Sequence, residues 1–310
     1  VNGKKEFRPN MFIAALRGHT MRLLGGLTDA ATAKQITKKL WGGFDGSSAV
    51  VGLLGATFNY DDNHIKWEKN KQFYSLSEGE LDIFLFQDNI SDDERKQLED
   101  TVTHLIQFTL LFSSFGKSWR RVCHKKFLFE SYFKKPEKRP IGSHCEFIDE
   151  STSLYLPVNE REDIKDFERI LKDFIDEAQN SIKTWIPEDK QTEQGVNSWR
   201  ESWYAPKVQV WARFAKDSQS KAIHWFHDEY SEGKSIKNPH FLAGSMGKTG
   251  RIWHRMYPHY ISRDLDDKIV AGEGYIELLT IFPYFSNNNN SDSTDFLNFL
   301  RDDPDFQQIW

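Results

Sequence analysis

The chain has 310 residues, enough for one large domain or two small ones. Its two cysteines exclude a disulfide scaffold and fit a reducing cytosol. No apolar run approaches the roughly 20 residues of a membrane helix, which excludes an integral membrane protein. The net charge of −5 argues against a nucleic-acid binder, provided that the charge is evenly spread.

The first part of the chain predicts two helices, then strands, then a longer helix. Residues 11–24 have the apolar spacing of a helix, with Arg17 and His19 off its buried face, and the pair Gly25–Gly26 should end it. Asp29 should cap the next helix. The elements expected after this cap are a helix over 29–40, strands over 49–58 and 80–86, and an acidic-capped helix over 92–112.

The rest of the chain alternates helices and strands without the regular period of a parallel barrel. Residues 162–183 give the clearest helix, because their apolar residues fall on one face. The other expected elements are a linker at 187–198, strands at 208–214, 222–226 and 275–282, a Gly-rich basic loop at 240–260, and a short helix after Asn287–Asn290. This irregular order favours an α+β fold, organised as two related halves.

Charge is segregated along the chain, so the total conceals basic stretches. Residues 77–100 hold nine acids against two bases, and residues 286–310 hold five acids against one base. Three stretches are basic and poor in acids: 1–28, 116–126 and 237–263. A basic surface can bind phosphates while acidic surfaces elsewhere hide it in the net charge. The segregation therefore reopens nucleic-acid binding as a function.

A short motif occurs twice, 131 residues apart. Residues 116–124 read GKSWRRVCH and residues 247–255 read GKTGRIWHR. A nucleotide-binding P-loop needs a further glycine five residues before the Gly-Lys pair, where this chain has Leu111 and Leu242. The two copies therefore suggest a duplicated unit rather than a nucleotide-hydrolysing site.

The chemistry of the two loops suits close approach to a phosphate backbone. Glycine lets main-chain N–H groups come near phosphates, Lys and Arg add charge, and Trp119 and Trp253 are able to stack on unpaired bases. The candidate RNA-binding residues are Arg17, Arg22, Lys117, Trp119, Arg120, Arg121, His124, Lys248, Arg251, His254 and Arg255. The plainer alternative is a basic hairpin over an aromatic core.

Histidines suggest three further sites. Cys123–His124 and His144–Cys145 form a mirrored pair, but adjacent residues on an extended chain point to opposite sides, and zinc sites separate their cysteines by two to four residues. His224 and His227 allow a metal or acid/base role, although a half-buried strand edge is the simpler interpretation. His254 with His259 would suit a metal-independent ribonuclease. We expect no cofactor and no metal.

Residues 8–18 (RPNMFIAALRG) resemble the entry to the first helix of the RAMP superfamily, the repeat-associated proteins of CRISPR effectors. Leu16, Arg17 and Gly18 match the xLRG start of that helix. Gly25–Gly26, the short helix to Leu40 and the WGG at 41–43 are similar to the continuation in backbone subunits of type III complexes. The two repeated loops look like the glycine-rich loops that close the family's ferredoxin-like units. The resemblance covers most of residues 7–125 and, more loosely, 205–285.

The resemblance implies a ferredoxin-like (RRM-like) RAMP fold in two related units with a helical insertion. The units expected are 1–159 as the first, 160–198 as a helical insertion and linker, 199–285 as the second, and 286–310 as an acidic tail with a short helix. It also implies a cytoplasmic, RNA-binding subunit of a type III CRISPR ribonucleoprotein effector in antiviral defence. Its partners would be guide RNA (crRNA), target RNA and other effector subunits, with no membrane.

Cleaving members of the family carry an Asp just before the xLRG helix. Residues 1–10 contain Glu6 as their only acid, and RPNMF stands where the family usually has Pro-Gly-Ser-Ser. We therefore expect a scaffold rather than a target-cleaving subunit, closer to the larger end-capping type, unless an Asp precedes Val1. The alternatives are an endoribonuclease that processes guide precursors or cleaves target, and an α+β interaction module without an RNA role.

Overall fold

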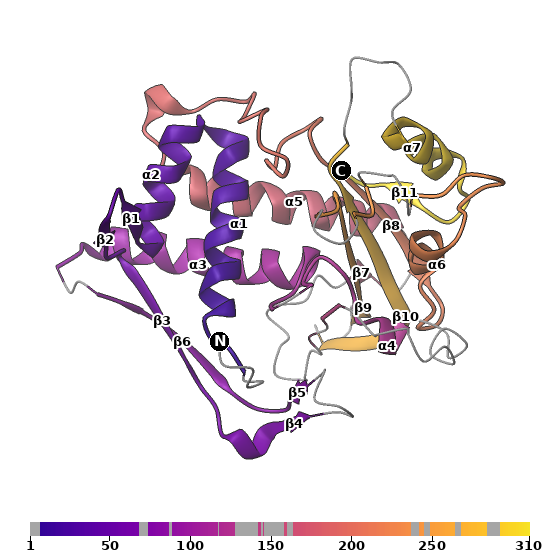
Figure 1. The fold of residues 1–310 in the computed structure, drawn as a ribbon, viewed down its shortest axis with the longest axis horizontal. Coiled ribbons are helices and arrows are strands. Elements are labelled where there is room, and N and C mark those ends of the chain that lie inside the picture. Colours follow the sequence, from indigo (N-terminus) through magenta and orange to yellow (C-terminus); the bar gives the residue numbers. More distant parts are fainter. Residues whose placement is uncertain are drawn as a thin grey trace.

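A group of helices lies beside a five-stranded sheet, which makes this a mixed α+β fold (Figure 1). The structure is a computed structural model. It describes residues 7–67, 74–86, 89–116, 118–127, 142–143, 145, 158–159, 164–236, 242–244, 249–263, 268–283 and 292–310. The α+β class is confirmed. The ferredoxin-like arrangement and the division into four units stay predictions.

Two consecutive helices, α1 (Met11–Leu27) and α2 (Ala30–Trp41), open the described chain. The Asp29 carboxylate accepts hydrogen bonds from the backbone N–H groups of Ala31 and Thr32, at 2.8 and 3.0 Å. These bonds satisfy donors that a helix start leaves unpaired, so the predicted cap is confirmed.

The prediction that Gly25–Gly26 ends the first helix is wrong, because α1 continues to Leu27. A Cβ on Gly26 would overlap with the carbonyl oxygen of Trp203, whose own N–H donates to the Arg22 carbonyl at 3.0 Å. The glycines are therefore needed for close packing of the 199–203 segment against α1. His19 was also placed wrongly off the buried face, since it is buried.

The long helices α3 (Asp92–Phe112) and α5 (Ile164–Lys183) run side by side and cross the direction of α1 (Figure 1). Ser91 caps α3 by accepting a hydrogen bond from the Glu94 N–H at 3.2 Å. The predicted apolar face of α5 is confirmed, because Phe167, Leu171 and Phe174 are buried in the main core.

The five-stranded sheet has β10 (Lys268–Ile281) as its centre, antiparallel to β8 (Gln209–Ala215) and to β9 (Ile252–Arg263). Its edges are β11 (Gln307–Gln308) beside β8 and β7 (Val158–Asn159) beside β9. Strands over 208–214 and 275–282 are thus confirmed. The loop predicted over 240–260 is wrong from Ile252 onward, where β9 begins.

Both faces of the sheet are covered, because successive side chains point to opposite sides of a strand. Val210 and Leu278 face the helical core, while Trp211 and Leu279 face α6 (Lys221–His227) and α7 (Asp292–Asp302). The prediction of a strand at 222–226 is therefore wrong, since these residues form α6. The short terminal helix is confirmed as α7, and Asn287–Asn290 lie outside the described residues.

Three two-stranded ribbons complete the described fold. Their strands are β1 (Gly43–Asp45) with β2 (Ser48–Val50), β3 (Leu54–Asn59) with β6 (Glu80–Leu85), and β4 (Ile65–Trp67) with β5 (Tyr74–Leu76). The short helical elements are α4 (His124–Phe127) and the 3₁₀ turns Asp62–His64 and Glu188–Lys190. Within the described part of the chain, no helix is both long and apolar enough to cross a membrane.

Candidate functional site

The two repeated loops lie next to each other in the structure. The His254 N–H donates a hydrogen bond to the Arg120 carbonyl at 2.9 Å, and the Arg121 guanidinium donates to the Ala243 carbonyl at 2.5 Å. The loops differ locally, because the first copy forms a turn before α4 and the second runs into β9. Lys117 and Lys248 lie outside the described residues. Proximity, rather than a shared local shape, relates the two loops.

Three arginines converge on one carboxylate, and we call Arg22, Arg120, Arg200 and Glu201 the arginine cluster. Arg22 comes from α1, Arg120 from the first repeated loop, and the other two from the segment before β8. The Arg22 Nε lies 2.8 Å from Glu201 Oε2. Arg120 binds both carboxylate oxygens, through Nε and Nη2, at 2.9 Å each. The Arg200 Nη2 approaches Oε1 at 3.3 Å.

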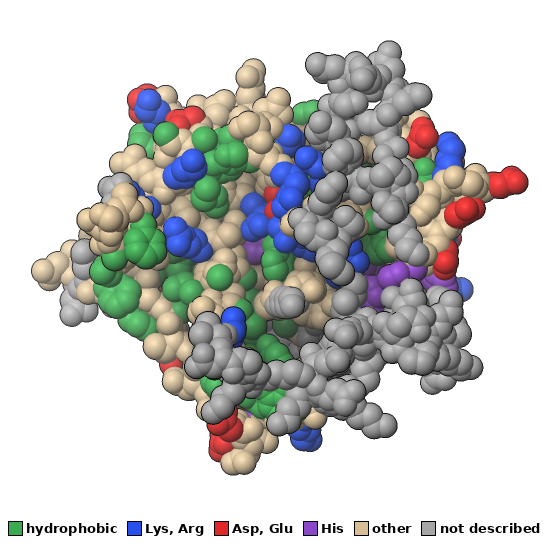
Figure 2. Space-filling view, viewed as in Figure 1, with side chains coloured by type: hydrophobic (Ala, Val, Ile, Leu, Met, Phe, Trp, Pro, Cys, Tyr) green, Lys and Arg blue, Asp and Glu red, His purple; other side chains and the backbone are tan. Residues whose placement is uncertain are grey.

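The cluster carries more positive than negative charge. Burial alone would raise the pKa of Glu201, but the hydrogen bonds from Arg120 and the charges of Arg22, Arg120 and Arg200 outweigh it and lower this pKa to about 2. Glu201 is therefore ionised at neutral pH, and one carboxylate faces three guanidiniums. Lys and Arg side chains gather near the middle of the face shown in Figure 2.

One donor of the cluster finds no acceptor among the residues that the structure describes. The Nε of Arg200 is buried and makes no hydrogen bond to the residues that the structure describes. The Arg200 side chain is nevertheless 35 % exposed, so its guanidinium reaches the surface. A buried donor without an acceptor is costly, so Arg200 is held less completely than Arg22 and Arg120.

Two indole rings make cation–π contacts with guanidiniums of the cluster. The Arg22 guanidinium lies over Trp119 at 4.9 Å and over Trp253 at 5.5 Å, measured to the ring centroids, and the Arg120 guanidinium lies over Trp119 at 4.0 Å. Trp253 is fully buried, so the prediction that it stacks on an unpaired base is wrong. Trp119 is only partly buried.

A cavity of about 240 Å³ lies beside the cluster and is lined by Gly18, His19, Arg22, Gly116 and Trp119, among others. A Cβ on Gly18 would lie 2.8 Å from the Arg22 Nη1, so this glycine leaves room for the guanidinium. Burial, together with the Arg22 charge, lowers the pKa of His19 well below its ordinary value. His19 is therefore neutral, with its Nε2 2.9 Å from the Ser113 hydroxyl.

Three of the predicted RNA-binding side chains do not reach the surface. Arg255 is 1 % exposed and donates from Nε to the Leu110 carbonyl at 2.8 Å. His124 is buried with its Nε2 3.1 Å from the His227 Nε2, and burial lowers the pKa of His124 to about 3. His254 is buried against Glu277. In this structure they stabilise the fold.

The predicted residues Arg17, Arg121 and Arg251 lie outside the cluster. Arg17 is exposed on α1, while Arg121 and Arg251 are partly buried. The Arg251 N–H donates a hydrogen bond to the Leu242 carbonyl at 2.7 Å, and the Arg251 carbonyl accepts one from the Phe282 N–H at 2.9 Å. Of the predicted RNA-binding residues, the structure therefore brings Arg22, Trp119 and Arg120 together. Arg17, Arg121 and Arg251 are not part of this group.

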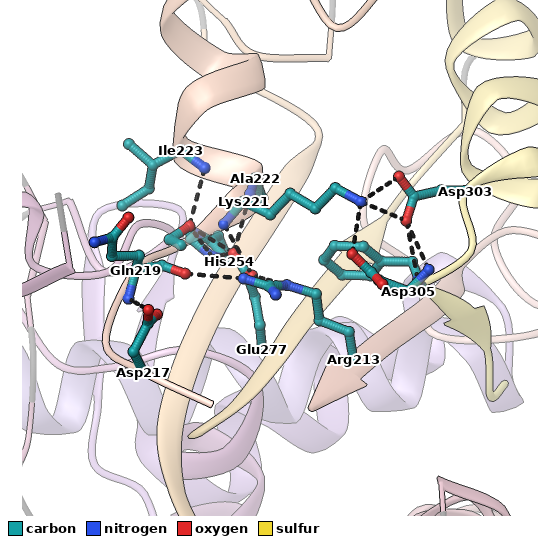
Figure 3. A network of polar contacts seen from close by, with 12 residues as sticks. Arg213, Asp217, Gln219, Lys221, Ala222, Ile223, His254, Glu277, Asp303 and Asp305 are labelled. Atoms are coloured by element: carbon teal, nitrogen blue, oxygen red, sulfur yellow. Dashed lines mark hydrogen bonds and ion pairs between the residues drawn. The ribbon is translucent and has the colours of Figure 1, made fainter. Parts of the chain in front are cut away.

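A second buried carboxylate fastens α6 to the sheet (Figure 3). Glu277 on β10 accepts hydrogen bonds from the Ser220 hydroxyl at 2.5 Å and from the backbone N–H groups of Lys221 and Ala222. It also lies 2.9 Å from the His254 Nε2. The remaining partner is the Arg213 Nε, at 2.6 Å. These partners come from β8, from β9 and from the start of α6, so the network joins α6 to the sheet.

The structure gives no support to the other predicted histidine sites. His259 is buried with its ring 4.7 Å from that of Phe214, so the pair His254 and His259 is closed to a substrate. His144 lies outside the described residues. No group of three side chains able to hold a metal occurs in the part of the chain that the structure describes.

Sequence reasoning missed Arg200 and Glu201. They stand in the segment Trp199–Trp203, which reads WRESW and directly follows the predicted linker at 187–198. Two tryptophans bracketing a charged pair were the available signal, because such a segment is too apolar for a solvated linker. No protein-family model matches this chain, and no curated protein matches it. The geometry of the cluster therefore carries the functional argument.

Proposed function

We propose that the chain binds RNA through the arginine cluster, as a subunit of a type III CRISPR effector of the RAMP kind. The observation that carries the proposal is the charge imbalance of the cluster, where three guanidiniums surround one ionised carboxylate beside a cavity. Two positive charges remain for an incoming phosphate, and Arg is the side chain best suited to bind it.

Glu201 prepares the cluster for phosphate. Its carboxylate orients Arg22 and Arg120 without neutralising them, so less conformational entropy is lost when a ligand arrives. Gly116, with a φ of +90°, brings the main chain of the first loop to the same cavity. The partly exposed Trp119 borders this cavity, where it would contact a base next to the bound phosphate.

RNA is favoured among phosphate ligands by the resemblance of the xLRG helix and of the glycine-bearing loops to the RAMP superfamily. Arg22 and the first loop belong to those segments, and they meet at the cluster. We propose that the strand is guide or target RNA, that base pairing carries the sequence information, and that the protein reads mainly the backbone. The role is that of a scaffold, and the ferredoxin-like units are part of the same proposal.

The test is a binding titration of the full chain with a short, unstructured, end-labelled RNA. Arg120→Ala removes two hydrogen bonds but leaves Glu201 paired with Arg22 and Arg200. We expect the affinity to fall about tenfold. The slope of log affinity against log salt should flatten by about 0.7 for each phosphate that the variant no longer binds.

Arg169→Ala on α5 is the matched control, because Arg169 is exposed and lies on another helix. It should bind RNA like the unaltered protein. Wild-type affinity for Arg120→Ala, with the same circular dichroism spectrum as the parent chain, would contradict the proposal.

A further inference from the structure

A second, larger cavity of about 550 Å³ lies where α1 meets α2. We call it the α1–α2 cavity. Its wall on α1 includes Arg17 and Met21, its wall on α2 includes Lys34, Gln35 and Lys38, and Phe44 of β1 stands at its side. None of these residues belongs to the arginine cluster, so the cavity is a separate feature of the same surface.

The α1–α2 cavity is basic. Arg17, Lys34 and Lys38 contribute three positive charges, and none of the described residues that line it is acidic. Lys34 and Lys38 are one helical turn apart on α2, so they project to the same side. A basic wall of this kind attracts an anion such as a phosphate.

Phe44 adds an aromatic surface to this basic wall. Its side chain is 74 % exposed, although burying a phenyl ring is ordinarily favourable. The ring sits in the hairpin of β1 and β2, whose turn contains Gly46 at a φ of +59°. An exposed ring among cations is the combination on which unpaired bases stack while their phosphates are neutralised. The exposed Gln35 carries an amide that can donate to and accept from a base edge.

We propose that the α1–α2 cavity is a nucleotide subsite for single-stranded RNA. One base stacks on Phe44, and the phosphates on either side of it contact Arg17, Lys34 and Lys38. This inference rests on the proposed function, because it extends the path of the same strand.

The position of α1 connects the two cavities. Arg17 lines the α1–α2 cavity, and Gly18 and Arg22 line the cavity beside the arginine cluster. Arg17 and Arg22 are five residues apart, which is about 7.5 Å along the helix axis and about 140° around it. They project from different sides of α1, so a strand that contacts both would pass across the helix over Gly18.

Two variants of the full chain test the subsite with a short uridine-rich RNA. Phe44→Ala should weaken binding about fivefold or more and leave the salt dependence unchanged, because it removes stacking but no charge. The double variant Lys34→Ala/Lys38→Ala should weaken binding and reduce the slope of log affinity against log salt by about 1.4. Photocrosslinking with iodouridine in the RNA should label the peptide that contains Phe44.

Matched controls keep the result specific. Phe86→Ala removes another exposed ring, 54 % exposed, and Lys172→Ala removes an exposed lysine on α5. Both should bind RNA like the unaltered chain, and a loss equal to that of the test variants would overturn the subsite.

The outcomes separate this inference from the proposed function. If Arg120→Ala binds weakly while Phe44→Ala and the double lysine variant bind normally, the subsite is wrong and the proposed function stands. If the unaltered chain binds no RNA, both are wrong. A poly-glutamate peptide whose binding depends on Phe44 and the two lysines, with RNA binding independent of them, would assign the cavity to an acidic protein segment and overturn the subsite.

Discussion

Two buried glutamates of this protein have similar pKa values and very different surroundings. Glu201 and Glu277 are each held by arginine, and in each case hydrogen bonds and nearby positive charge lower the pKa to about 2 against the effect of burial. Both are therefore ionised inside the fold at neutral pH. A sequence alone gives no reason to assign them different roles.

The difference lies in what surrounds each carboxylate. Glu277 has a single arginine, Arg213, and its other described partners are a hydroxyl, a histidine and two backbone N–H groups. Glu201 has three arginines, and one of them, Arg200, is 35 % exposed with a buried Nε that finds no acceptor among the described residues. The first set is close to charge balance and closed, whereas the second carries surplus charge and is open.

The comparison shows how one type of ion pair serves two purposes. A closed network stabilises the position of α6, because any loosening would leave a buried carboxylate without partners. A network with surplus positive charge, such as the arginine cluster, lowers the stability of the fold because its arginines repel one another. This cost falls when an anion binds. The balance of charge around a buried acid, rather than its burial, therefore separates a structural lock from a candidate binding site.

Among the substitutions, Glu277→Ala is expected to have the largest effect on stability. It leaves Arg213, His254 and the first N–H groups of α6 without their acceptor in the interior, which should lower the free energy of unfolding by about 3–5 kcal/mol. Urea denaturation followed by circular dichroism measures the loss. RNA affinity of the folded protein should stay unchanged, because this network is closed. A loss below about 1 kcal/mol would show that Glu277 is not a lock.

The fold shows which of these relations the sequence could predict. The helices over 92–112 and 162–183 and the cap at Asp29 were predictable, because apolar period and capping chemistry are local. The helix α6 was not, since AIHWF is a short apolar run that suits a strand equally well. Its helical form is stabilised by Glu277, which is more than 50 residues further along the chain.

The candidate site divides in the same way. Arg22, Trp119 and Arg120 could be nominated from their basic, glycine-bearing surroundings. Their common partner Glu201 could not, because its bonds to Arg22 and Arg120 span 179 and 81 positions. His254 and Arg255 were overvalued because a motif reports residue type, whereas their burial follows from the pairing of β9 with β10.

Acid should destabilise the protein in two stages. The pKa of His124 is lowered from 6.5 to about 3 by burial, so the unfolded chain binds this proton first and stability falls as the pH drops from about 6.5 towards 3. Glu201 and Glu277 have pKa values lowered from 4.5 to about 2, so stability falls further between about pH 4.5 and 2, by about 3 kcal/mol for each group.

Urea denaturation at pH 7, 5 and 3 measures both stages. Glu277→Gln should flatten the lower one, because the glutamine does not titrate. An equal free energy of unfolding at pH 7 and pH 3 for the unaltered chain would contradict this assignment of ionised buried carboxylates.

Glu201→Gln should separate the two glutamates most clearly. It keeps the size of the side chain but leaves three guanidiniums without a carboxylate, which should cost about 2 kcal/mol of stability. The glutamine oxygen still accepts a hydrogen bond from the cluster and so keeps part of its orientation, while the surplus charge rises from two to three. We expect the added charge to outweigh the lost orientation, so RNA should bind the folded variant more tightly and raise its thermal midpoint more than that of the parent. Glu277→Gln is the control, with lower stability and no gain in RNA affinity. Equal RNA affinity of Glu201→Gln and the parent would contradict the assignment of Glu201 to a binding site and Glu277 to a structural network.

Among the variants that change RNA affinity, Gly18→Ala should have the smallest effect. It tests whether the position of Arg22 in the arginine cluster matters for binding. A helical alanine is favoured over glycine by up to about 1 kcal/mol, so α1 itself should not be weakened. The new Cβ would stand 2.8 Å from the Arg22 Nη1, which is the flexible end of its side chain, so the guanidinium should move rather than the helix. RNA affinity should therefore fall a few-fold while the thermal midpoint stays the same or rises. If affinity and midpoint fell together, packing of α1 rather than the position of Arg22 would explain the role of this glycine.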